Sequence, residues 1–310
     1  MTFTIESIKY RLGEKRIAVQ QICIDNNRNY ERLIVRSGFE FVHRTMESDE
    51  VFFADFLSSE LNPLEKDFII LVNQSMPSLI PGKISKLFAD RLDVRSCGFL
   101  EVSDGCTGFA RALLIANSIL ESSTSSRVHV ICAEKYSKFY DDRQESVSPI
   151  FSDAISVTTL TRNGRNRVLG HSFLNFFADS QVISVAKNDG GSETLKMEGA
   201  KVLGWALREV PKVVINLLEE HGLSIKEINS WYIHQGSKIV VESLLESLGV
   251  VPSDNFTAAD VGNTVSSTIP ILLSESGVIL EEPFIPKGYS VILGFGVGLS
   301  IVAMLLEVTS

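Results

Sequence analysis

The stretch that decides the fold is VSDGCTGFARALLIANSIL at residues 102–120. Gly105 and Gly108 flank Cys106 and allow a tight turn, after which nearly every position is apolar. A segment that is apolar almost all round predicts a helix buried at the centre of the protein, here over residues 108–120. Because the run at 99–102 indicates a strand, we expect Cys106 where a strand ends and a buried helix begins.

Short β-branched runs alternate with longer helical segments on both sides of this stretch. The expected strands lie at residues 68–72, 99–102, 128–133, 155–161 and 231–234, with two more near the end of the sequence. A second long helix, with one apolar face, is expected over residues 199–221, before a Gly222 stop signal. This alternation is typical of α/β proteins. A chain of 310 residues is long enough for one large domain or two mid-sized ones.

The two halves of the chain look alike in outline. LEKDFIILVNQS at residues 64–75 and IKEINSWYIHQGS at 225–237 both place an acidic and lysine-containing segment before a strand, then Gln and a small residue. Either an internal duplication or a chance similarity explains this pattern. We take duplication as the hypothesis, with halves at residues 1–161 and 162–310. Because no Pro- or Ser-rich linker separates them, we expect the halves to share an interface.

The composition excludes several classes of function. The chain has 29 Lys and Arg against 38 Asp and Glu, and this net charge of -9 opposes general binding to nucleic-acid backbones. Four cysteines without a C-x-x-C pair are too few for a secreted disulfide scaffold. The N-terminal segment also lacks the pattern of a signal peptide. We therefore expect a cytoplasmic protein with no nucleic-acid partner.

The longest apolar run could be either a membrane span or a pair of buried strands. GYSVILGFGVGLSIVAMLL at residues 288–306 has no charge over 19 positions and is long enough to span a membrane. However, Gly294, Gly296 and Gly298 interrupt it between two β-branched runs, which indicates two buried strands joined by a glycine turn. We therefore expect a hairpin and no membrane span.

Three side chains have surroundings that suit catalysis. Cys106 precedes a buried helix, whose positive end and free N–H groups favour a thiolate and can hold an oxyanion. His234 ends a strand, and strand ends host sites in α/β sheets. Asn263, just before a helix expected at 266–274, is either an ordinary N-cap or a partner of the other two. The remaining histidines are expected to be structural: His43, His129, His171 and His221.

In order and spacing, Cys106, His234 and Asn263 resemble the Cys-His-Asn triad of the β-ketoacyl-acyl-carrier-protein synthase III family in the thiolase superfamily. The similarity extends to further motifs: Arg36-Ser-Gly38, Asp142-Arg143, Met197-Glu-Gly199 and Gly294-Phe-Gly-Val-Gly298. It covers the chain from about residue 30 onward. It implies a thiolase-like five-layer αβαβα fold, of the α/β class, built from two duplicated halves.

The resemblance implies an acyltransferase. Cys106 would take an acyl group from a thioester, and neutral His234 and Asn263 would stabilise the enolate left when a malonyl thioester loses carbon dioxide. The backbone N–H groups of Cys106 and Val297 would form the oxyanion hole. Four further residues would contact the substrate: Arg36, Ile80, Arg143 and Phe295.

The same resemblance implies the partners. Acyl-CoA or an acyl carrier protein would deliver the acyl group, and the family pattern calls for no metal and no cofactor beyond these thioesters. It also implies a homodimer formed through the strand at 128–133, with residues 76–81 bordering the partner's acyl tunnel.

The chain departs from the family pattern at positions that concern the substrates. The family's His-Gln-Ala-Asn is His-Gln-Gly-Ser here, and Arg32 replaces the tryptophan that usually stacks on adenine. Glu242 and Glu246 stand where basic residues commonly receive the carrier protein. We therefore expect a divergent member in a specialised fatty-acyl or polyketide-type pathway. Two alternatives stay open: transfer of the acyl group to a hydroxyl or amine with His234 as general base, and a non-catalytic partner subunit.

Overall fold

The computed structural model describes residues 2–75, 97–141, 143–144, 146–176, 182–187, 193–251, 255–280 and 284–309. The first half contains β1 (Thr2–Leu12), β2 (Lys15–Ala18), α1 (Val19–Asp25), α2 (Tyr30–Ser37), β3 (Phe41–Arg44), α3 (Asp49–Glu60), β4 (Phe68–Val72), β5 (Gly98–Val102), α5 (Gly108–Ser122), β6 (Arg127–Glu134) and β7 (Ala154–Arg162). The second half contains β8 (Asn166–Asn175), β9 (Ile183–Lys187), β10 (Glu193–Met197), α6 (Gly199–Glu220), β11 (Ile228–Ile233), α7 (Lys238–Ser247), α8 (Thr268–Leu280), β12 (Gly288–Gly296) and β13 (Ser300–Val308).

The strands repeat one pairing pattern in the two halves. The order is β11-β12-β13-β8-β1-β7-β6-β4-β5, and the halves meet where β1 pairs with β8 at Thr2–Arg167 and Phe3–Asn166. In the first half β4 and β6 are parallel, and β6, β7 and β1 are successively antiparallel. In the second half β11 and β12 are parallel, and β12, β13 and β8 are successively antiparallel. The fold therefore consists of two similar strand systems joined side to side.

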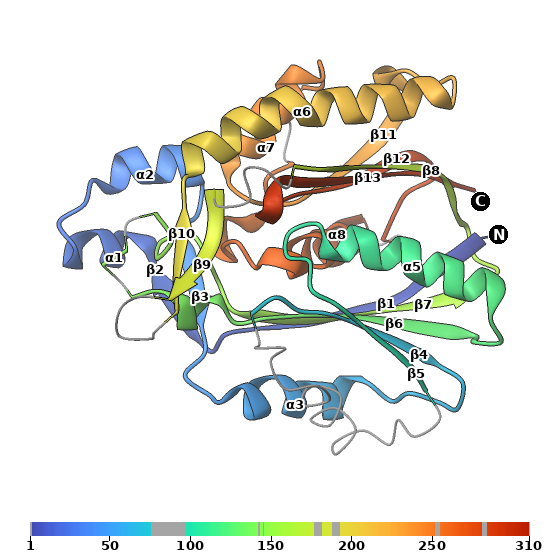
Figure 1. The fold of residues 1–310 in the computed structure, drawn as a ribbon, viewed down its shortest axis with the longest axis horizontal. Helices are drawn as coiled ribbons and strands as arrows, with labels where there is room; N and C mark the ends of the chain where they lie inside the picture. Colours follow the sequence, from blue (N-terminus) through green and yellow to red (C-terminus); the bar gives the residue numbers. More distant parts are fainter. Residues whose placement is uncertain are drawn as a thin grey trace.

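Figure 1 shows these strand systems stacked with helices in five layers. Helices α6 and α7 cover the second-half sheet, α5 and α8 lie between the two sheets, and α3 covers the first-half sheet. Three apolar clusters fill the spaces between the layers, and the central one joins α5 and α8 to the inner faces of both sheets. The expected αβαβα architecture is confirmed.

Helix α5 anchors the centre of the molecule. One face of the helix is fully buried: Phe109, Ala112, Leu113, Ala116 and Leu120 are at most 1% exposed. The apolar side chains on its other side, Leu114, Ile115 and Ile119, are partly buried. Burial of each large apolar side chain stabilises the fold by about 2–3 kcal/mol. A Cβ on Gly108 would collide with the side chain of Val72 on β4, so glycine is required where the helix starts. The start of α5 is thereby fixed against the sheet.

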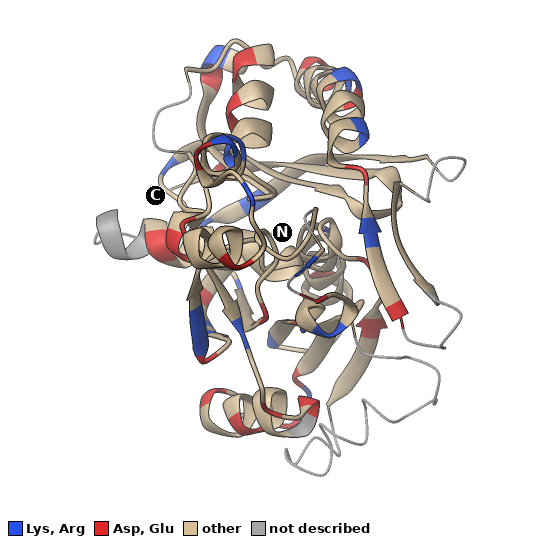
Figure 2. Ribbon diagram, turned by 90° about the vertical axis from the view of Figure 1, so that its left-hand side faces the viewer, with Lys and Arg blue, Asp and Glu red and all other residues tan. Residues whose placement is uncertain are grey.

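Two further expectations about elements are confirmed, whereas the helix expected at 266–274 begins later, as α8 at Thr268, after the 3-10 turn Val265–Ser267. Helix α6 begins and ends within one residue of the expected bounds, and the apolar run at 288–306 forms the antiparallel hairpin of β12 and β13. Within the described residues, no helix is both long and apolar enough to cross a bilayer. On the face seen in Figure 2, Lys and Arg are interspersed with Asp and Glu along the outer elements.

The expected dimer strand is corrected by the sheet order. Strand β6, which contains residues 128–133, pairs with β4 on one side and β7 on the other. Its backbone hydrogen bonds are therefore used within the chain, and it cannot pair with a second copy. The outermost strand of this end of the sheet is β5.

Candidate active site

Cys106 lies in the turn between β5 and α5, two residues before the helix begins. Its side chain is almost fully buried, at 6% exposure. The end of β12 covers it closely: a Cβ on Gly294 would lie 2.8 Å from the Cys106 carbonyl oxygen. A Cβ on Gly296 would lie 3.0 Å from Sγ. The turn after β12 can therefore close over the cysteine because both positions are glycine.

The electrostatic surroundings of Cys106 favour the thiol. Burial, together with the carboxylates of Glu134 and Asp104, raises the pKa of the thiol to about 12. Backbone N–H groups of Val297 and of Cys106 itself act in the opposite direction but do not outweigh burial. The helix N-terminus was expected to favour a thiolate, whereas burial at this position favours the thiol. Desolvation at this depth exceeds the stabilisation that a helix N-terminus gives.

Val297 and Cys106 provide two backbone N–H groups beside the sulfur. Val297 begins the short 3-10 turn Val297–Leu299, and it follows Gly296, whose φ is 147°. This positive φ turns the Val297 N–H toward Sγ, a conformation that glycine adopts without strain. The arrangement suits an oxyanion next to the cysteine, and the role of the two N–H groups stays a prediction.

His234 follows β11 and is 2% exposed. Its backbone N–H donates to Leu293 O at 2.9 Å, which continues the β11–β12 ladder by one residue. The ring stands edge-on to Phe295, with 5.7 Å between the centroids, and Nδ1 lies 2.7 Å from Thr268 Oγ1. Burial lowers the pKa of His234 to about 3, so the imidazole is neutral.

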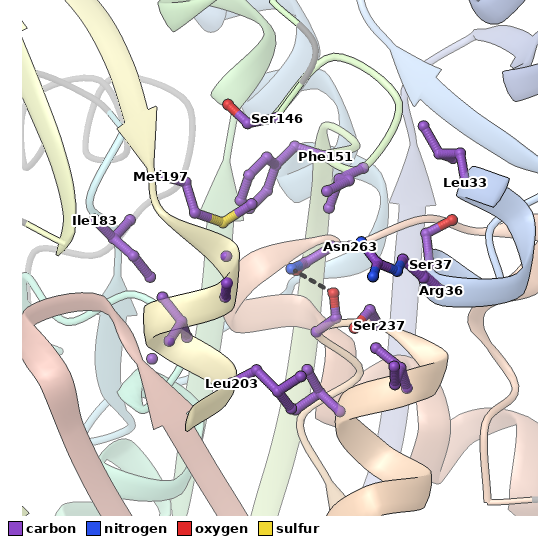
Figure 3. A pocket seen from close by; sticks show the side chains of 18 of the residues that line it. Leu33, Arg36, Ser37, Ser146, Phe151, Ile183, Met197, Leu203, Ser237 and Asn263 are labelled. Atoms are coloured by element: carbon purple, nitrogen blue, oxygen red, sulfur yellow. Dashed lines mark hydrogen bonds between the residues drawn. The ribbon is translucent and has the colours of Figure 1, made fainter. Parts of the chain in front are cut away.

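Asn263 is held by both its backbone and its side chain. Its N–H donates to Ile150 O at 2.8 Å, and its carbonyl accepts from Ser152 N at 2.9 Å. The side-chain Oδ1 accepts from Val265 N at 2.9 Å, which identifies Nδ2 as the donor end of the amide. Nδ2 lies 3.5 Å from Gly236 O, in the middle of the pocket in Figure 3. The amide is therefore oriented to donate into the pocket.

The three side chains line one cavity of about 800 Å³. Figure 3 shows Asn263 at its centre, with Ile183 and Met197 on one side and Arg36 and Ser37 on the other. Phe295 and Val297 line the same cavity. The cavity is large enough for an extended thioester and joins a polar mouth to an apolar interior.

Of the other two expected substrate residues, only Arg143 is described, and it lies outside the cavity. Arg143 is exposed and pairs with Asp141 at 3.5 Å, and it is not among the residues that line the cavity. Ile80 lies outside the described residues. The structural histidine His129 binds Thr159 and Asp67. It is buried on β6 and, like the other three histidines expected to be structural, is not among the cavity-lining residues.

Sequence reasoning did not identify Glu134 or the walls formed by β9, β10 and α6. Glu134 ends β6, is fully buried, and accepts from Gln74 N, Ser75 N and Ser266 Oγ at 3.0–3.3 Å. Burial raises the pKa of Glu134 to about 7. A carboxylate directly after the apolar run 128–133 was the available signal. Arg28 and Arg32 also line the mouth beside Arg36.

Comparison with known proteins agrees with this geometry. Residues 100–177 match the family described as 3-oxoacyl-[acyl-carrier-protein] synthase III, and residues 218–308 match its C-terminal domain. The β-ketoacyl-[acyl-carrier-protein] synthase III of Lactococcus lactis subsp. cremoris is 30% identical over 258 residues, which cover 78% of each chain. The corresponding protein of Porphyra umbilicalis is 27% identical over 263 residues, covering 80% of this chain and 79% of the relative.

Solved structures show the same fold. The 3-oxoacyl-[acyl-carrier-protein] synthase III from Aquifex aeolicus superposes with a TM-score of 0.84 at 22% identity, over 98% of this chain and 99% of that one. Fold and sequence together define a thiolase-like condensing-enzyme architecture. The chain belongs to the 3-oxoacyl-[acyl-carrier-protein] synthase III family.

Proposed function

We propose that this protein loads an acyl group onto Cys106 and condenses it with a malonyl thioester, with loss of carbon dioxide. The observation that carries the proposal is the convergence of Cys106, His234 and Asn263, from three separate loops, on one buried cavity. Membership of the synthase III family supports the reaction type. The divergent residues around the cavity favour a specialised fatty-acyl or polyketide-type pathway.

The first half-reaction is thioester exchange. Sγ of Cys106 attacks the carbonyl carbon of the donor thioester, and the N–H groups of Cys106 and Val297 stabilise the negative charge on the carbonyl oxygen. The carbon–sulfur bond of the donor then breaks. The departing thiol carries away the proton that Cys106 has lost, so the products are acyl-Cys106 and a free thiol.

The second half-reaction forms a carbon–carbon bond. The malonyl carboxylate leaves as carbon dioxide, and the electron pair of the broken bond moves into an enolate. Nδ2 of Asn263 donates to the enolate oxygen, since Oδ1 is already held by Val265. A neutral amide and the neutral ring of His234 support this charge without the acidity that would protonate the carbon. The enolate carbon then attacks the acyl carbonyl, and the carbon–sulfur bond to Cys106 breaks. The sulfur leaves with the electron pair of that bond and takes up a proton from solvent, which restores the thiol.

The mouth of the cavity suits a donor that carries phosphate. Arg28, Arg32 and Arg36 line it together, and guanidinium groups bind phosphate oxygens through paired N–H groups. This supports acyl-CoA or an acyl carrier protein with a phosphopantetheine arm as the donor. Because Lys238 on nearby α7 pairs with Glu242 at 3.8 Å, the three arginines are the stronger cationic group at this opening.

Three further properties belong to the same proposal. The protein acts as a homodimer, which the position of β5 at the end of the sheet supports, because an outermost strand offers free hydrogen-bonding groups. It needs no cofactor, because acyl exchange at a cysteine is complete with its thioester substrates. It works in the reducing cytoplasm, where its cysteine thiols stay reduced.

Two measurements test the proposal. Intact mass after incubation with acyl-CoA and acyl-carrier donors should show an adduct on the wild type that Cys106→Ala does not form. Carboxyl-labelled malonyl thioester added to the acylated protein should then release labelled carbon dioxide. Asn263→Ala should keep the adduct but lose most of the release, by about 100-fold, as expected for a removed oxyanion donor.

The outcomes separate the alternatives. An adduct that transfers to an alcohol or amine without carbon dioxide release would replace condensation by acyl transfer with His234 as general base. A wild type that forms no adduct with any donor in a broad panel would indicate a non-catalytic subunit. An adduct that maps to Cys97 instead of Cys106 would contradict the assignment of the nucleophile.

A further inference from the structure

Val265 connects the two polar partners of Cys106. It lies in the 3-10 turn Val265–Ser267, with a φ of 57°, which is an outlier for a β-branched residue. Its N–H donates to Asn263 Oδ1 at 2.9 Å, and its carbonyl accepts from Thr268 Oγ1 at 3.1 Å. Thr268 in turn contacts His234. One strained residue therefore organises the hydrogen bonds of both side chains.

The Thr268 hydroxyl has two neighbours and a single proton. Its oxygen lies 3.1 Å from Val265 O and 2.7 Å from His234 Nδ1, and the side chain is buried. A carbonyl oxygen only accepts, so the hydroxyl donates to Val265 O whenever that bond is made. The contact with Nδ1 is then a hydrogen bond only if Nδ1 carries the proton. Both bonds are satisfied by one tautomer of the neutral ring.

We propose that Thr268 is a positioning residue that holds resting His234 as its Nδ1–H tautomer, which leaves Nε2 as a proton acceptor toward the cavity. The hydrogen bond made by one ring nitrogen decides which nitrogen is protonated. His234 lines the cavity, and Nδ1 is occupied by Thr268 on the opposite side of the ring. The role rests on the proposed acyl loading and adds a residue to it.

A proton acceptor is needed because Cys106 must lose its thiol proton before it can hold an acyl group. Because its thiol is not ionised at rest, the proton must leave as Sγ attacks the thioester carbonyl. Nε2 takes this proton while the new carbon–sulfur bond forms, and returns it to the sulfur of the departing thiol as the old bond breaks. The ring is neutral before and after the step. For the condensation step, the Thr268 hydroxyl can give up its bond to Val265 O and donate to Nδ1 instead, which allows the Nε2–H tautomer.

Two measurements test this role without any acyl donor, so failure of acyl transfer leaves the test intact. The first is the ¹⁵N spectrum of the His234 ring in the free protein, assigned by its loss in His234→Gln. The second is the alkylation rate of Cys106 by iodoacetamide, followed by peptide mass. The variants are Thr268→Val, which removes the hydroxyl, and Thr268→Ser, which keeps it. Thr264→Val is the matched control, because the buried Thr264 hydroxyl has no hydrogen-bond partner among the described residues.

The wild-type spectrum should show a protonated Nδ1 and a bare Nε2. Thr268→Val should move the proton toward Nε2 and slow alkylation of Cys106 about tenfold, the equivalent of one lost hydrogen bond. Thr268→Ser should restore both, and Thr264→Val should change neither. A resting wild-type ring protonated on Nε2, or wild-type alkylation in Thr268→Val, would overturn the proposal. The wild-type spectrum decides the tautomer even if Thr268→Val does not fold.

Discussion

The backbone of Gly296 packs directly against Cys106: a Cβ at this glycine would lie 3.0 Å from both the Cβ and the Sγ of the cysteine. The two residues are 190 positions apart in the sequence, yet the turn after β12 brings them into contact. The same turn supplies the Val297 N–H beside the sulfur. The nucleophile and its expected oxyanion donor therefore depend on one close backbone approach.

Gly296→Ala should reduce acyl-Cys106 formation by about 100-fold, because the added methyl group displaces the turn and its N–H donor. The rate of adduct formation by intact mass measures the effect. Gly298→Ala is the matched control, since Gly298 also has a positive φ, 72°, but no atom within 4 Å of its Cβ position. That variant should lose about 1 kcal/mol of stability from backbone strain and load within about twofold of the wild type. Equal loading by both variants would contradict the role of the close approach.

Replacing Arg32 and Arg36 together by Ala should weaken the use of acyl-CoA. Both side chains line the mouth of the cavity, so their loss should lower kcat/KM about tenfold through KM, the range of one or two charge-assisted hydrogen bonds. The matched substrate is the acyl-pantetheine thioester, which has no phosphate and should be used equally by both proteins. A similar loss with both substrates would show that the arginines maintain the shape of the cavity opening and do not bind phosphate.

Glu134→Gln should change how stability depends on pH. Burial raises the pKa of this carboxyl from 4.5 to about 7, so between these values the folded protein holds a proton that the unfolded chain has released. Stability from this group therefore falls as pH rises from about 4.5 to 7, by on the order of 3 kcal/mol. Urea unfolding at pH 5 and pH 8 should show this loss in the wild type and not in Glu134→Gln. Parallel pH profiles for the two proteins would exclude a titrating Glu134.

The ion cluster at the far end of β6 should affect stability and leave catalysis intact. Asp67 Oδ2 accepts from Arg127 Nη2 at 2.6 Å, Leu64 N at 2.7 Å and His129 Nε2 at 3.2 Å. Asp67→Asn should destabilise the fold by about 3 kcal/mol, because it leaves a partly buried Arg127 unpaired. Acyl loading below the unfolding transition should match the wild type. A selective loss of loading would contradict the structural role of His129.

Sequence patterns predicted those helices and strands whose conformation depends mainly on the residues within them. The apolar continuity of 108–120 predicted α5, and the glycine-interrupted run at 288–306 predicted the β12–β13 hairpin. Cys106, His234 and Asn263 could be found because each lies at a turn with recognisable flanking residues. Their convergence on one cavity agrees with that interpretation.

Properties that depend on distant parts of the chain could not be predicted in this way. The raised pKa of Cys106 results from burial under β12 and from Glu134, neither of which is near it in sequence. The positive φ of Val265 occurs in a turn that packs against β6, β7 and α5, which are distant in sequence. The expected dimer strand was wrong for the same reason, since only the complete sheet order shows which strand is outermost.

The place of β13 in the sheet has a consequence for biosynthesis. This strand is made last among the described elements, yet it lies between β12 and β8 and bonds to both. Strand β8 emerges from the ribosome more than a hundred residues earlier, and its edge toward β13 stays unpaired until residues 300–308 follow. Such distant pairings make folding slow and leave strand edges open to aggregation. We expect the second half to need chaperone protection during translation, while the first half can close as soon as β7 has been synthesised.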